Sequence, residues 1–122
     1  MTFSSYEQGP EIELQYLKTS LVPMDNIQIS WKALGPMRQV LLRVYGREEA
    51  EARKLAKEVG GHLKQALPPS MVLQTLTPKG YDPLRQQYEY HLPISVGVEN
   101  KTAFETIVRE CRHLGFRGRL GG

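Results

Sequence analysis

Residues 39–69, QVLLRVYGREEAEARKLAKEVGGHLKQALPP, decide the fold because they combine a buried strand with an amphipathic helix. Gln39–Tyr45 contains a nearly unbroken apolar run, which is typical of a strand in the middle of a sheet. From about Arg47, apolar residues recur every three or four positions and charged residues occupy the other side, which indicates a helix packed on that sheet. Pro68 and Pro69 prevent this helix from extending much further.

Four further segments have the patterns of strands. Apolar and polar residues alternate in three of them, which predicts one buried and one solvated face, and the other is a short apolar run. These segments are 11–18, 27–32, 71–76 and 88–98. Pro93 lies within the last segment and cannot donate a hydrogen bond to a neighbouring strand. We therefore expect this strand to lie at a sheet edge or to carry a bulge near Pro93.

A second helix is predicted close to the C-terminus. Thr102 and Glu105 have the spacing of a capping box, and Gly115 is placed to end the helix. The first helix contains a weak point, Gly60-Gly61, because each glycine costs a helix about 1 kcal/mol relative to alanine. We expect this pair to let a neighbouring backbone come close.

The order of these elements predicts the fold class. From Gln39 onward it is strand, helix, strand, hairpin, strand, helix and short strand, which fits an α+β, ferredoxin-like split βαβ sandwich. Such a fold has an antiparallel sheet with two helices on one face, and the one or two extra N-terminal strands would extend the sheet or cover its open face. A ubiquitin-like β-grasp is the alternative if 27–32 and 39–45 form a hairpin. The second helix, with its own caps and apolar stripe, favours the ferredoxin-like fold.

The length of 122 residues is that of one domain. We expect a flexible N-terminal arm over 1–10, a single α+β domain over 11–116 and a basic, glycine-rich C-terminal tail over 117–122. Residues 116–120 also fit a short edge strand.

Composition excludes several protein classes. No apolar run approaches the roughly 18 residues of a membrane span, and the N-terminus lacks the pattern of a secretory signal. The single Cys111 cannot form an internal disulfide, so the expected location is the cytoplasm or another reducing compartment.

Positive charge is concentrated at the C-terminal end. The net charge is +3, and residues 1–100 hold eleven basic and eleven acidic residues, so the whole excess lies beyond them. Arg109, Arg112, Arg117 and Arg119 are therefore predicted to contact phosphate or an acidic protein. The alternative is a solvated helix end, where basic side chains are favoured by the helix dipole.

Two tyrosines form a second candidate site. Tyr88 and Tyr90 share one face of a predicted strand, beside Arg85, and aromatic residues at this spacing stack the bases of single-stranded RNA. The alternative is that both tyrosines continue the core face of the strand, because the alternating pattern has no break there.

Residues for catalysis, metal binding or cofactor binding are poorly placed. His62, His91 and His113 are far apart in sequence, and none has a ligand spacing to Cys111. Cys111 continues the apolar stripe of the second helix, so we expect a buried, unreactive thiol. Neither a glycine-rich phosphate loop nor a pair of catalytic carboxylates is evident. We therefore expect a protein that is not an enzyme and binds no metal and no cofactor.

The leading hypothesis is a non-catalytic subunit that docks onto a larger protein or ribonucleoprotein assembly through its basic C-terminal segment and a sheet edge. The order of elements is similar to that of several small ribosomal and RNA-binding domains, although a fold does not imply a function. The alternative is a protein-binding adaptor that uses strand addition and never contacts nucleic acid. A small enzyme is a minor alternative. A ubiquitin-like modifier is another, because residues 119–122, Arg-Leu-Gly-Gly, resemble the tail of such modifiers.

Overall fold

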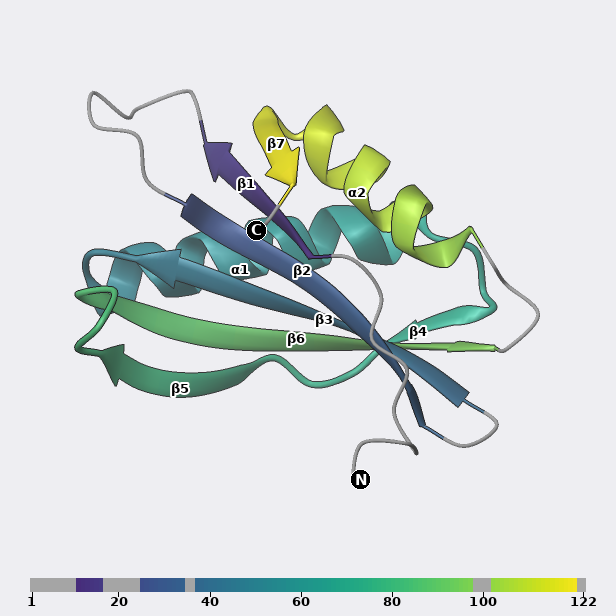
Figure 1. Cartoon of the computed structure of the whole chain (residues 1–122), viewed down its shortest axis with the longest axis horizontal. Coiled ribbons are helices and arrows are strands. Elements are labelled where there is room, and N and C mark those ends of the chain that lie inside the picture. The colour runs from purple at the N-terminus through teal and green to yellow at the C-terminus, as the bar shows by residue number, and fades with distance from the viewer. Residues whose placement is uncertain (1–10, 17–24, 35–36, 98–101, 121–122) are drawn as a thin grey trace.

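The computed structural model describes residues 11–16, 25–34, 37–97 and 102–120 (Figure 1). The predicted N-terminal arm, 1–10, and the last two residues, 121–122, lie outside these ranges. Within them the chain forms seven strands and two helices. Their bounds are β1 Ile12–Tyr16, β2 Asp25–Leu34, β3 Met37–Gly46, α1 Glu49–Ala66, β4 Met71–Leu73, β5 Thr77–Asp82, β6 Gln87–Gly97, α2 Ala103–His113 and β7 Phe116–Leu120.

All strands belong to one antiparallel sheet. Its order is β4-β6-β3-β2-β1-β7, and β5 pairs with β6 on the same side as β4. The apolar strand β3 lies inside the sheet, between β2 and β6, as its sequence predicts. Both helices lie on one face of the sheet and pack against each other (Figure 1). The α+β class, the antiparallel sheet and the two helices are thus confirmed.

The ferredoxin-like strand order is not confirmed. That order would place β7 beside β3, but β2 and β1 lie between them, and β7 pairs with β1. The reason is the hairpin of β2 and β3, which pairs from Ile27 opposite Val44 to Leu34 opposite Met37 and so occupies that side of β3. The N-terminal strands are therefore inserted into the sheet. The same hairpin is the one that the β-grasp alternative requires.

The core lies between the two helices and the sheet face that they cover. Alternate residues of each inner strand point into it, and full burial of one leucine or isoleucine contributes about 1.5–3 kcal/mol. The sheet contributes Leu14, Ile27, Ile29, Val40, Leu42, Val44, Tyr90, Leu92, Ile94 and Val96. The helices contribute Ala52, Leu55, Ala56, Val59, Leu63, Ala103, Ile107, Val108 and Cys111.

Pro93 lies inside the sheet, although we expected an edge or a bulge. On one side of β6 the neighbouring strand is interrupted at this point, because β4 ends at Leu73 and β5 begins at Thr77. The carbonyl oxygen of Pro93 accepts a hydrogen bond from the N–H of Gln74 at 2.8 Å, within that interruption. The nitrogen and carbonyl of one strand residue point to the same side, so the missing donor of Pro93 faces the gap and breaks no ladder.

Helix α1 continues through Gly60 and Gly61 without a close backbone neighbour. A Cβ at Gly60 would meet the Cδ2 of Leu92 at 3.5 Å, which is an ordinary contact with a side chain. A Cβ at Gly61 would have no heavy atom within 4 Å among the residues that the structure describes. The expectation of a close backbone approach is therefore wrong, and the pair only weakens the helix.

We expect the substitution Gly61→Ala to raise the free energy of unfolding by about 1 kcal/mol. Alanine restricts the unfolded chain and meets only open space in the folded helix. Urea unfolding followed by circular dichroism measures the difference. A loss of stability would show that α1 requires the backbone freedom of a glycine at this position.

The ends of helix α2 differ in how well the sequence predicts them. Thr102 is the N-cap residue, but it makes no side-chain cap hydrogen bond, so the predicted capping box is not formed. Its φ of −100° and ψ of 10° depart from the extended conformation that directs a cap hydroxyl at the helix. Gly115 ends the helix as expected, with a φ of 100° and its N–H bonded to the carbonyl of Arg112 at 3.0 Å. Strand β7 follows directly, so most of the predicted tail is an edge strand.

Candidate functional site

Helix α2 and strand β7, residues 103–120, hold four arginines and two glutamates, a net charge of +2 out of the chain's +3, and we call them the α2–β7 unit. The side chain of Arg109 is 63% exposed, and Arg112 is also exposed. The Nε of Arg109 lies 3.8 Å from the Oε2 of Glu110. An exposed ion pair of this kind contributes about 0–1 kcal/mol, so Arg109 stays available to a partner.

Strand β7 places the other two arginines at a margin of the sheet. In its antiparallel register with β1, Arg117 lies opposite Gln15 and Arg119 lies opposite Glu13. Helix α2 packs on β7, and the turn at Leu114 and Gly115 joins them. The four arginines predicted to bind a partner thus belong to two adjacent elements.

Glu110 on α2 contacts two histidines, one on each helix, which lie far apart in sequence. Its Oε1 lies 3.2 Å from the Nε2 of His62 on α1 and 3.5 Å from the Nδ1 of His113, three residues further along α2. The Glu110 side chain is only 15% exposed. His62 and Glu110 are 48 positions apart, so no local pattern could reveal their contact. The contact of His62 with Glu110 thus joins α1 to α2, the helix of the α2–β7 unit.

Tyr90 belongs to the core and does not form an exposed stacking surface. Its side chain is on the face that the helices cover, and the residue is 6% exposed. Its hydroxyl donates a hydrogen bond to a carboxylate oxygen of Glu49 on α1, and this bond raises the pKa of Tyr90. Because neither face of the ring is accessible, Tyr90 cannot stack a base, and the core alternative applies.

Arg85 was predicted to lie beside Tyr88, but the two side chains are apart. Tyr88 is half-buried on the helix side, where its ring meets that of Tyr81 edge-on, with centroids 5.2 Å apart. Arg85 instead lies over the ring of Tyr45, with its guanidinium carbon 3.8 Å from the ring centroid. Tyr45 follows the core residue Val44, so its side chain is on the opposite face of the sheet from Tyr88. Tyr88 and Tyr90 thus share one face of the sheet, as predicted, but Arg85 is on the opposite face and does not lie beside them.

Tyr45 lies on the open face of the sheet, and it is covered. The residue is 3% exposed because Arg85 lies on its ring. Burial raises the pKa of Tyr45 to about 12, so the phenol is neutral at physiological pH. A cation held against an aromatic ring contributes about 0.5–2 kcal/mol to stability. Here the contact holds the turn between β5 and β6 against β3.

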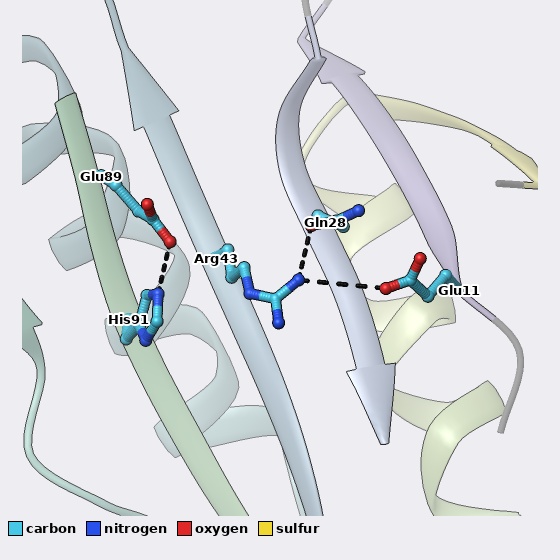
Figure 2. Close-up of polar contacts among 5 residues, drawn as sticks. All are labelled: Glu11, Gln28, Arg43, Glu89 and His91. Atoms are coloured by element: carbon cyan, nitrogen blue, oxygen red, sulfur yellow. Dashed lines mark hydrogen bonds and ion pairs between the residues drawn. The ribbon is translucent and has the colours of Figure 1, made fainter. Parts of the chain in front are cut away.

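Polar side chains form two groups on the open face, one around Arg43 and one of His91 with Glu89 (Figure 2). Arg43 donates from its Nη1 to the Oε1 of Gln28 at 2.7 Å, and the same nitrogen lies 3.9 Å from the Oε2 of Glu11. Beside them, His91 and Glu89 share a hydrogen bond. Gln28, Arg43 and His91 are opposite one another in the register of β2, β3 and β6. Both carboxylates, Glu11 and Glu89, thus already have a partner within the chain.

Cys111 has the environment of a structural thiol. The residue is fully buried, and this burial raises the pKa of the thiol to about 12. The thiolate is therefore negligible at neutral pH, and Cys111 is not a nucleophile in the folded chain.

Over the ranges that the structure describes, no group of three or more His, Cys, Asp or Glu residues is arranged to hold a metal ion. Neither described helix is long and apolar enough to cross a membrane.

No known protein family, characterised protein or solved structure matches the chain.

Proposed function

We propose that this chain is a non-catalytic binding subunit that docks onto a larger assembly through the α2–β7 unit and the sheet edge that β7 forms. The observation that carries the proposal is the exposure of Arg109 and Arg112 on the helix that packs against this edge. The charge of the remaining chain supports it, because residues 1–100 are neutral in total. The electrostatic attraction of a partner would thus come from one side of the molecule.

We infer that the sheet is a ferredoxin-like split βαβ unit into which β2 and β1 are inserted. The support is the order of elements from β3 to β7 and the antiparallel direction of every pairing. Such an insertion moves β7 away from β3 to the margin of the sheet. A partner then has access to β7 without disturbing the core strands.

The partner favoured by the side-chain arrangement is a protein with an acidic surface. Readers of single-stranded RNA use exposed aromatic rings beside their basic residues. Tyr90 is instead in the core, and Arg85 covers Tyr45. The arginines of the α2–β7 unit would bind carboxylates by charge-assisted hydrogen bonds. The single, buried Cys111 suits a reducing compartment such as the cytoplasm.

RNA is the second candidate partner, because four arginines occur within the last 14 residues of the chain. Phosphate contacts would release counterions, so the affinity for a single-stranded oligouridylate should fall steeply as salt rises. Removing one phosphate-binding arginine should reduce the slope of log affinity against log salt by about 0.7. A flat slope excludes RNA and leaves the acidic protein partner.

The proposal is tested by co-purification of the tagged full chain from its source cells, with and without ribonuclease. Replacing Arg109, Arg112, Arg117 and Arg119 with glutamine should abolish retention of the partner at physiological salt, because the charge of the docking side is lost. The matched control replaces four exposed lysines elsewhere. They are Lys54, Lys57, Lys64 and Lys79.

The control variant should retain the partner at wild-type level. Equal retention by both variants would contradict docking through the α2–β7 unit. Loss of the partner on ribonuclease treatment would assign the assembly to the ribonucleoprotein class.

A further inference from the structure

The two margins of the sheet differ in whether they can accept another strand. At one margin, β4 has three residues, and the register of β5 shifts between Pro78 and Gly80. Pro78 has no N–H to donate, Gly80 has a φ of 88°, and Lys79 is exposed. Proline, bulges and lysine are the features by which natural sheets prevent strand addition. This margin is therefore protected.

The margin formed by β7 is regular. Strand β7 pairs with β1 over five consecutive residue pairs, from Ile12 opposite Leu120 to Tyr16 opposite Phe116, without a register shift. No other strand of the described ranges pairs with β7. Its sequence, Phe-Arg-Gly-Arg-Leu, contains no proline. The backbone N–H and C=O groups on the outer side of β7 can therefore form hydrogen bonds with an added strand.

The residues of β7 indicate which segment fits. Arg117 and Arg119 are two apart and so share a face of the sheet, while Phe116 is buried on the face that α2 covers. The neighbour that β7 already has is β1, which places Glu13 opposite Arg119. From Glu11, the sequence of β1 alternates acidic or polar residues with apolar ones. A strand of the same alternation would match the outer side of β7.

We propose that the outer edge of β7 binds an extended segment of a partner protein by antiparallel strand addition, with acidic side chains opposite Arg117 and Arg119 and apolar side chains between them. This inference rests on the proposed function and names its partner class. Opposite charges directly across two strands stabilise the pairing. A second copy of this chain fits poorly, because pairing β7 with itself about Gly118 would place Arg117 opposite Arg119.

The probe is an octapeptide with the sequence of β1, Gly-Glu-Ile-Glu-Leu-Gln-Tyr-Gly, added to the ¹⁵N-labelled full chain. The expected result is a shift of the amide resonances of residues 116–120 and slower exchange of the outward N–H groups of β7. The control peptide carries lysine in place of both glutamates, and its dissociation constant should be about tenfold larger. A peptide N-methylated on the residues whose N–H groups would point to β7 should not bind, because it cannot form the ladder.

Charge exchange separates strand addition from nonspecific attraction. Arg117→Glu should invert the preference, so that the lysine peptide binds more tightly than the glutamate peptide. Arg117 is opposite Gln15 in the register of β7 with β1, so this change puts no like charge directly across the two strands. The matched control, Lys57→Glu on the exposed side of α1, should keep the original preference.

Three outcomes would overturn the inference: equal affinity for the two peptides, shifts confined to β4 and β5, or displacement of β1 from β2. Its failure is distinguishable from that of the proposed function. If the peptide does not bind β7 but the four-arginine variant still loses its partner, docking stands and strand addition fails. If the peptide binds β7 and that variant keeps its partner, the edge is competent but the native assembly does not use the arginines.

Discussion

Replacing Tyr90 with alanine is expected to lower the free energy of unfolding by about 3–4 kcal/mol, whereas a stacking residue would lose binding with little loss of stability. The residue is 6% exposed and packs among the apolar side chains of the core. Removing its ring leaves a cavity between β6 and α1, because packed backbones collapse only partly around a deleted side chain. Its position in the core therefore determines the size of the effect.

Tyr90→Phe separates the ring from its hydroxyl. This variant keeps the core volume and loses only the hydrogen bond to Glu49, whose side chain is 48% exposed, so we expect a much smaller loss of stability than for Tyr90→Ala. The pKa of Tyr90 is raised above its ordinary 10.0, so the stabilisation by this group is complete below pH 10 and is lost as the pH rises further. Urea unfolding at pH 7 and at pH 11 measures both effects. A stable, folded Tyr90→Ala protein that no longer binds its partner would restore the stacking interpretation.

Gly46→Ala is expected to destabilise the fold by about 3 kcal/mol, because there is no room for a methyl group where β3 meets α1. A Cβ at Gly46 would lie 2.6 Å from the nitrogen of Ala52 and 2.9 Å from its Cα. These are backbone atoms, and the N–H of Ala52 is bonded to the carbonyl of Glu48 at 3.0 Å. Backbone atoms in a helix cannot rotate out of the way as a flexible side chain can. The whole start of α1 must move away from the sheet to admit the alanine.

Equilibrium unfolding in urea measures this cost, with Gly61→Ala as the matched control. The same substitution meets backbone atoms at Gly46 and open space at Gly61, so the two variants should change stability in opposite directions. A Gly46→Ala protein as stable as the wild type would show that α1 does not pack as closely on β3 as the distances indicate. Sequence analysis gave no sign of this contact, because a glycine at the end of a strand is common and its neighbour is six positions away.

The location of secondary structure was predictable because it depends on local patterns. The alternation of β6 and the three-and-four spacing of α1 and α2 placed these elements, and Gly115 ended α2 where its positive φ permits. The cap of α2 was not predictable in the same way. Thr102 and Glu105 have the right spacing, but the backbone at Thr102 is not extended, and residue spacing does not predict that backbone conformation.

The candidate site was predictable only where it depends on charge along the chain. Counting charges identified the arginines of the α2–β7 unit, and the structure adds that Arg109 and Arg112 are exposed. The tyrosines were ambiguous, since alternation shows which residues share a face but not which face the helices cover. The contacts of Arg85 with Tyr45 and of His62 with Glu110 join different elements, and no spacing predicts them.

By itself, the amino-acid sequence of this protein determined the α+β class, the two helices, the alternating strands and the concentration of arginine at the C-terminal end. Each of these follows from residues within a few positions of one another. Only the tertiary structure decided that β2 and β1 separate β3 from β7, that Tyr90 is buried against α1, and that β7 forms a regular margin. The physical reason is that a strand has two edges, and the competition among distant segments for those edges is settled by packing of the whole sheet.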